Sequence, residues 1–160
     1  MRGRLDSIDW VILKELQADG SITNVELARR VGLSAPPCLR RVRALEQAGI
    51  IKGYRAMLDP QALGIEIVCF AMVQLEAQGQ RELTAFENRV RAWAPVRECW
   101  KLSGDIDFIL KCVAPNLAAF QAFVSDLTGL PNVRNVRTAL TLDLVKDEPL
   151  VPVQEAEAAG

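Results

Sequence analysis

Three arginines stand close together in the stretch of this sequence best suited to bind a polyanion. Arg40, Arg41 and Arg43 lie within residues 34–55, which carry five basic side chains and one acidic one, a net charge of +4. Guanidinium groups bind phosphate and the edge of guanine through paired hydrogen bonds. A merely solvated helix face would also carry arginines, so the arginines alone leave both interpretations open. The helix signals around them favour DNA binding.

Two predicted helix starts position these arginines. Thr23, with Glu26 three residues later, has the pattern of a capping box, and Ser34 predicts a second N-cap with prolines in the following turn. Gly32 lies where the earlier helix must stop. Two short helices joined in this way predict a helix-turn-helix, whose second helix reads base edges in the major groove. The candidate DNA-binding residues are Thr23, Ser34, Pro37, Arg40, Arg41 and Arg43.

The apolar residues of the same region predict its packing. Leu39, Val42 and Leu45 recur every three residues and are expected to form the buried stripe of the second helix. Residues 5–16 predict a preceding helix, capped by Asp6 and apolar along one side. Three helices of this size predict a compact DNA-binding domain.

Residues 50–58, which follow the helices, predict either a short hairpin or an extended exit. Lys52 and Arg55 in this segment could contact phosphates as a wing does, or could be solvated, and the sequence favours neither. We expect a winged helix-turn-helix domain that ends near Asp59-Pro60.

The charge is distributed unevenly over the 160 residues. The net charge is −1, but residues 1–59 carry +3 and residues 60–160 carry −4, so only the first part is expected to contact nucleic acid. Half of the residues are hydrophobic, which is enough for a core. Residues 1–9 lack the apolar run of a signal peptide, and the longest apolar run, 67–73, is far too short for a membrane helix. A cytoplasmic protein is expected.

Residues that could perform catalysis or bind a metal are scarce. The sequence has no histidine, no Cys-x-x-Cys and no phosphate-binding loop, so we expect neither an enzyme nor a zinc site, and no catalytic residue, metal or cofactor is assigned. Cys69, Cys99 and Cys112 are expected to be small buried thiols. Cys99 and Cys112 could face each other across a hairpin, but a reducing cytosol argues against a disulfide.

The second half of the chain repeats a pattern of strands and helices. Period-two and period-3.6 patterns predict the order βαββαβ, which is the ferredoxin-like arrangement of a four-stranded antiparallel sheet with two helices on one face. The predicted strands are 65–76, 96–103, 106–114 and 133–145, and the helices are 80–93 and 116–128. The expected fold class is α+β. The expected domains are a helix-turn-helix domain at 1–58, a hinge at 59–65, a ferredoxin-like domain at 66–147 and a tail at 148–160.

The first strand of the sheet is apolar on both sides. Residues 67–73 are hydrophobic at every position, although the helices cover only one face of such a sheet. A bare apolar face usually marks an interface, so we expect a second copy of the chain to cover it. A helix or tail of the same chain is the alternative.

The turn between the two middle strands contains candidate ligand-binding groups. Asp105 and Asp107 could bind an ammonium group, and the backbone amides around Gly104 could bind a carboxylate. Glycine and aspartate are also common in ordinary hairpin turns, and the spacing alone favours that simpler interpretation.

The motifs of both halves together resemble the Lrp/AsnC family of transcriptional regulators, over residues 5 to about 147. The matching motifs are Leu5-Asp6-Ser7-Ile8-Asp9, Glu26-Leu27-Ala28, Val31-Gly32-Leu33-Ser34, Cys38-Leu39-Arg40-Arg41-Val42-Arg43-Ala44-Leu45-Glu46, Gly49-Ile50-Ile51, Ser103-Gly104-Asp105-Ile106-Asp107-Phe108-Ile109-Leu110 and Val145-Lys146.

The resemblance implies that the second domain dimerises and binds an amino-acid effector between copies, near the Gly104 turn. In the family, dimers often assemble into tetramers or octamers. Trp100 occupies a position that is often aromatic, and Thr138 matches the second residue of a Thr-x-Thr pair, of which Val136 replaces the first. The implied effector-binding residues are Trp100, Ser103, Gly104, Asp105, Asp107 and Thr138.

The sequence therefore predicts a DNA-binding transcriptional regulator that responds to a small effector, most simply an amino acid. A dimer would place two recognition helices about one helical turn apart, or a multiple of it, on double-stranded DNA, so the operators should be imperfect palindromes. The alternative is an amino-acid sensor that acts through protein contacts instead of DNA. The last residues of the tail, beyond the shared pattern, are expected to be mobile.

Overall fold

The computed structural model describes residues 5–153, and the chain folds into two compact units. Among the described residues, the first unit comprises 5–57 together with 146–153, and the second comprises 58–145. The segment expected to be a tail thus groups with the DNA-binding end of the chain. The mobility expected of its last residues falls outside the described residues. Within 5–153, no helix is long and apolar enough to cross a membrane.

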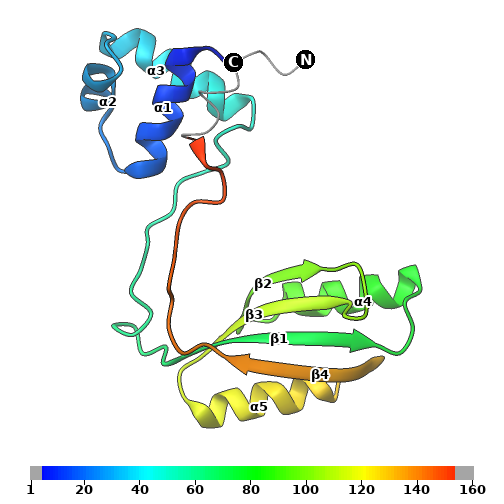
Figure 1. Cartoon of the computed structure of the whole chain (residues 1–160). Coiled ribbons are helices and arrows are strands. Elements are labelled where there is room, and N and C mark those ends of the chain that lie inside the picture. Colours follow the sequence, from blue (N-terminus) through cyan, green and yellow to red (C-terminus); the bar gives the residue numbers. More distant parts are fainter. Residues whose placement is uncertain (1–4, 154–160) are drawn as a thin grey trace. The chain divides into compact units, whose positions relative to one another are not determined.

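Within residues 5–57, the first unit contains three helices, coloured blue to cyan in Figure 1. They are α1 (Ser7–Ala18), α2 (Asn24–Arg30) and α3 (Ala35–Gln47). Asp6 caps α1, as predicted: its carboxylate accepts a hydrogen bond from the Asp9 amide at 2.9 Å, and the Asp9 carboxylate accepts one from the Asp6 amide at 3.2 Å. The three helices enclose a core of Ile12, Leu27, Ala28, Cys38, Val42 and Leu45.

Two sequence-based details of this unit are wrong. The Thr23 hydroxyl accepts a hydrogen bond from the Glu26 amide, but the Glu26 carboxylate bonds to two arginines instead of reaching back, so the capping box is one-sided. The buried stripe of α3 is Cys38, Val42 and Leu45, whereas Leu39 is 37% exposed. Positions i, i+4 and i+7 share one face of a helix, and Leu39 lies one step off that face.

Residues 50–58 contain no β-strand. Of the two expectations for this segment, the structure has the extended exit. Tyr54 anchors it to α3, because the Tyr54 hydroxyl donates a hydrogen bond to the Glu46 carboxylate at 3.1 Å. The segment leads into the second unit.

The second unit has the predicted order βαββαβ. Its elements are β1 (Ile67–Leu75), α4 (Gln80–Arg91), β2 (Val96–Lys101), β3 (Phe108–Ala114), α5 (Leu117–Thr128) and β4 (Val133–Leu140). The strands form one antiparallel sheet in the order β2-β3-β1-β4, which confirms the ferredoxin-like fold (Figure 1). Strand β4 ends at Leu140, five residues before the predicted end.

Alternate residues of the central strands face the two helices and form the core. Cys69 lies directly opposite Cys112 in the β1–β3 register, and both are at most 2% exposed. Phe86 from α4 and Phe123 from α5 pack onto the same face. Cys99 on the edge strand β2 is exposed and lies opposite Leu110. The prediction that Cys99 is buried is therefore wrong, and Cys99 does not face Cys112, which the sequence had left as a possibility.

The other face of the sheet is not covered by helices. Phe70 on β1 is 37% exposed and Trp100 on β2 is 55% exposed, while Met72 and Ile109 on the same face are half-buried. The apolar run of β1 therefore packs on its helix side and remains accessible on the other.

Candidate DNA-binding face and effector region

The exposed face of α3 carries two arginines that are available to a ligand. Arg40 and Arg43 lie three residues apart, which places them on neighbouring positions of one helix face, and both are exposed. Within residues 5–153, no carboxylate lies at ion-pair distance from either guanidinium. Ser34 has the extended backbone of an N-cap, but its hydroxyl makes no capping hydrogen bond, so it too is available at the start of the helix.

The third arginine, Arg41, lies on a different side of the helix. Its Nη1 is 2.8 Å from a carboxylate oxygen of Asp6 and 2.8 Å from one of Asp9. Its side chain is 31% exposed. These contacts raise the pKa of Arg41, with Asp9 as the larger cause. Arg41 therefore fastens α3 to the N-terminal turn of α1, and its partners lie 35 and 32 residues away in the sequence.

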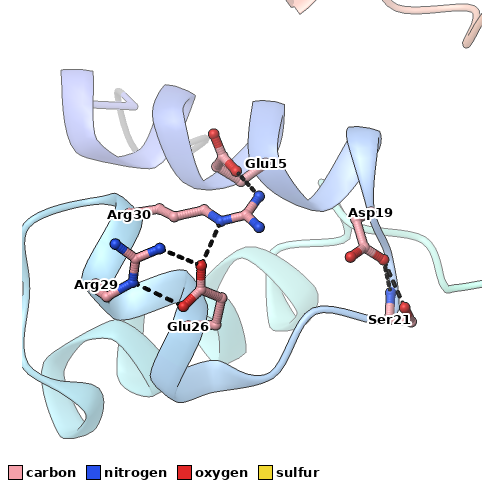
Figure 2. A network of polar contacts seen from close by, with 6 residues as sticks. All are labelled: Glu15, Asp19, Ser21, Glu26, Arg29 and Arg30. Atoms are coloured by element: carbon pink, nitrogen blue, oxygen red, sulfur yellow. Dashed lines mark hydrogen bonds and ion pairs between the residues drawn. The ribbon is translucent and has the colours of Figure 1, made fainter.

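A second polar network holds α2 in place (Figure 2). The Glu26 carboxylate accepts hydrogen bonds from Arg29 and from Arg30, and Arg30 also donates to Glu15 of α1 at 2.8 Å. The two arginines, Arg29 first, lower the pKa of Glu26 to about 2. The network joins α1 to α2, the helix that supports α3.

The junction between α2 and α3 is closed by a side chain. Asn24 donates from Nδ2 to the Ala35 carbonyl at 2.8 Å, which ties the start of α2 to the start of α3. Thr23 is exposed at the beginning of α2, and Pro37 is half-buried in the opening turn of α3. The predicted DNA-binding residues thus gather at the two helix starts and along α3, with Arg41 as the member engaged inside the unit.

The loop from β2 to β3 contains the predicted effector residues of the Gly104 turn. Gly104 has φ of +116°, and a Cβ built there would meet no atom within 4 Å. The glycine is therefore required by the backbone conformation and not by close packing. Ser103 and Asp105 on either side are exposed and open to a ligand.

Asp107 differs from Asp105, because its carboxylate is already used inside the domain. Asp107 is 8% exposed, and its Oδ2 accepts a hydrogen bond from the Leu75 amide at 2.7 Å. The β1–β3 ladder ends at Val73, so the Leu75 amide lies beyond the ladder and the carboxylate provides its acceptor. The Asp107 amide also donates to the Val73 carbonyl at 3.0 Å.

Trp100 and Thr138 do not converge within one chain. Trp100 is on the edge strand β2, opposite Ile109, and belongs to the open face. Thr138 is on the other edge strand, β4, opposite Ala71, which is 0% exposed on the helix side. Directly opposite residues of an antiparallel pair point to the same face, so the two side chains lie on opposite faces and at opposite edges of the sheet.

Val136 on β4 and Glu98 on β2 both make contacts within one chain. Val136 lies opposite Val73 and packs on the core, so the residue that replaces a family threonine completes the hydrophobic packing. Glu98 was missed by sequence reasoning. Its carboxylate accepts a hydrogen bond from Trp100 Nε1 at 3.3 Å and forms an ion pair with the Lys111 ammonium at 3.3 Å. Its position two residues before Trp100 on a strand is the signal that could have indicated it.

The groove between α4 and β2 holds about 480 Å³, but none of the predicted effector residues lines it. Glu87, Cys99 and Lys101 are among the residues that do. The described part of one chain therefore does not gather the predicted effector residues around this groove.

Comparison with known proteins identifies both units. Residues 5–52 match the profile of a winged helix-turn-helix DNA-binding domain, and residues 68–151 match that of the Lrp/AsnC ligand binding domain. The chain belongs to the Lrp/AsnC family. This Lrp/AsnC chain is 59% identical to a leucine-responsive regulatory protein of Rhizobium meliloti, over 92% of the chain and 95% of the relative. It is 41% identical to the leucine-responsive regulatory protein of Escherichia coli, over 89% of this chain and 87% of that relative.

Solved structures of Lrp/AsnC regulators share the fold along almost the whole chain. A Neisseria meningitidis regulator in complex with L-Met superimposes with a TM-score of 0.90 at 34% identity, covering 96% of this chain and 99% of that one. An AsnC family regulator of Agrobacterium tumefaciens superimposes with a TM-score of 0.87 at 30% identity, covering 94% of this chain and 99% of that one. The protein is thus a transcriptional regulator with a helix-turn-helix DNA-binding domain and a ligand-binding domain of the Lrp/AsnC type.

Proposed function

We propose that this regulator binds imperfect palindromic operators as a homodimer, or as an assembly of dimers, and responds to an aliphatic amino acid of the leucine or methionine class. The observation that carries the DNA-binding part is the exposed pair Arg40 and Arg43 on α3. The effector class is supported by the leucine-responsive relative at 59% identity and by the structural neighbour with bound L-Met.

In this proposal Arg40 and Arg43 contact bases or phosphates directly. Ser34 and Thr23 contribute hydroxyls at two helix starts that also present backbone amides to the phosphates. Pro37 preserves the opening turn of α3. Arg41 acts as a positioning residue, because its guanidinium is held by Asp6 and Asp9 and sets the placement of α3 against α1.

The homodimer is supported by the open face of the sheet. Phe70 and Trp100 are large, apolar and exposed there. A second copy would remove this surface from water, at roughly 25 cal/mol for each Å² of apolar area buried. The proposed effector site would draw on more than one chain, since one chain leaves Trp100 and Thr138 on opposite faces and at opposite edges of the sheet.

The effector site proposed here lies around the Gly104 turn. Ser103, Asp105 and the backbone of Gly104 are exposed and offer a carboxylate together with amide donors, which suits the two charged groups of a free amino acid. Asp107 supports the turn from inside through its bond to Leu75. We further propose that the protein acts in the cytoplasm and without catalysis, metal or cofactor.

The DNA-binding part is tested by titrating selected operator duplexes at several salt concentrations. Replacing both Arg40 and Arg43 by alanine removes two cations, so the slope of log K against log salt should become less steep by about 0.9 for each lost phosphate contact. Arg81→Ala, which removes an exposed arginine of the second unit, is the matched control. An unchanged affinity and slope for the double variant would refute the role of this face.

The effector is tested by a thermal-shift screen against the twenty amino acids. A ligand that binds only the folded state at one hundred times its dissociation constant stabilises the protein by about 2.7 kcal/mol. Leucine or methionine should raise the melting temperature of the wild type and leave that of Asp105→Ala unchanged. A hit confined to polar amino acids would contradict the proposed effector class.

A further inference from the structure

The chain returns to its DNA-binding unit after the second unit is complete. It leaves that unit after Met57 and re-enters it at Lys146, and the ribbon of Figure 1 shows this return in red. Gln17, in the last turn of α1, donates from Nε2 to the Val151 carbonyl at 3.0 Å. The two residues are 134 positions apart in the sequence, so this contact belongs to the tertiary structure.

The exposure of the returning segment changes sharply along its length. Leu150 is 89% exposed and Val151 is 56% exposed, but Val153 is only 6% exposed. Ordering a chain segment costs backbone entropy, about 1–2 kcal/mol per residue, which only favourable contacts can offset. In the described part of the segment, Val153 is buried and the Val151 carbonyl accepts a hydrogen bond from Gln17, which indicates contacts of this kind.

We propose that the C-terminal segment 146–153 is a strap that docks on the last turn of α1, with Val153 as its apolar anchor and the Val151 carbonyl as its polar anchor. The occupant of this surface is the chain's own segment, and the docked strap forms part of the DNA-binding unit. Val153 lies outside both family profiles, of which one ends at residue 52 and the other at residue 151.

The strap makes the stability of α1 depend on residues that follow the effector domain. Gln17 lies on the exposed side of α1, away from Ile12 in the core, so the strap covers a side of the helix that α2 and α3 leave open. The predicted DNA-binding residues lie on α2 and α3, so DNA and the strap use different helices. Undocking the strap should therefore loosen α1 without removing a DNA contact.

The test is hydrogen–deuterium exchange of the full chain carrying Val153→Asp. A carboxylate at a buried anchor should undock the strap and speed the exchange of α1 amides about tenfold, which corresponds to about 1.4 kcal/mol. Leu150→Asp is the matched control, because it places the same charge in the same segment at an exposed position. It should leave the exchange of α1 unchanged.

Two further variants separate the anchors. Gln17→Ala should speed α1 exchange by a smaller factor, about threefold, and a chain that ends at Glu148 should reproduce the effect of Val153→Asp. Amides of β1 and β3 serve as the internal reference and should keep their wild-type rates. Equal α1 rates in Val153→Asp and Leu150→Asp would overturn the proposal, as would a parallel acceleration in β1 and β3, which would show that the effect is not local.

Discussion

Asp107 offers the sharpest test of what stabilises the second unit. Replacing Asp107 by alanine removes the acceptor of the Leu75 amide, which donates to Asp107 Oδ2 at 2.7 Å. Leu75 is only 2% exposed, so water cannot easily replace this acceptor. Hydrogen bonds to charged groups contribute roughly 1.5–3 kcal/mol, and a buried amide left without a partner loses its solvation as well. We expect the free energy of unfolding of the second unit to fall by about 2 kcal/mol.

The assay is thermal unfolding followed by calorimetry. For a domain of about this size, 1 kcal/mol corresponds to a shift of about 4–8 °C in melting temperature, so the transition of the second unit should fall by about 8–16 °C. Asp107→Asn keeps an oxygen acceptor and should recover most of the loss. The transition of the DNA-binding unit should not move.

The control is Asp105→Ala, two residues earlier in the same turn and exposed. This variant should lose the effector response. Its free energy of unfolding should stay within about 0.5 kcal/mol of the wild-type value. The reasoning is refuted if Asp107→Ala is as stable as Asp105→Ala. That result would mean that the Leu75 bond contributes nothing and would return Asp107 to the role of a ligand-binding residue.

Three further outcomes are expected. Arg41→Ala should weaken operator binding with dimerisation unchanged, and should speed amide exchange in α1, because the ion pairs to Asp6 and Asp9 are lost. The pKa of Glu26 is lowered from 4.5 to about 2, so its ion pairs should stabilise the first unit fully above pH 4.5. This stabilisation should be lost as the pH falls from 4.5 towards 2. In Glu26→Gln, the free energy of unfolding measured as a function of pH should depend less on pH over this range. Phe70→Asp should shift sedimentation towards the monomer, whereas Thr84→Asp, on the exposed side of α4, should not.

Much of the fold was predictable because its signals are local. The caps at Asp6 and Thr23 involve residues three positions away, and the two βαβ repeats follow from the periods of strand and helix. The same local reasoning failed by one position on α3, where Cys38 and not Leu39 is buried, because both residues are apolar and the pattern alone does not choose between them.

The candidate sites were predictable in type and less so in arrangement. The basic character of α3 is a property of the sequence, but Arg41 is engaged with carboxylates 35 and 32 residues away, which no local pattern indicates. Cys99 was expected to be buried because its strand is apolar, and it is exposed because that strand lies at the edge of the sheet.

The sequence by itself determined the order of the elements, the helix-turn-helix with its basic helix, and the turn at Gly104, since each depends on residues within a few positions of one another. Only the tertiary structure decided which groups are available. It holds the Asp107 carboxylate on Leu75, separates Trp100 from Thr138 by sheet order, and brings Val151 back to Gln17. These three results depend on strand register and long-range packing, which bring together residues far apart in the chain.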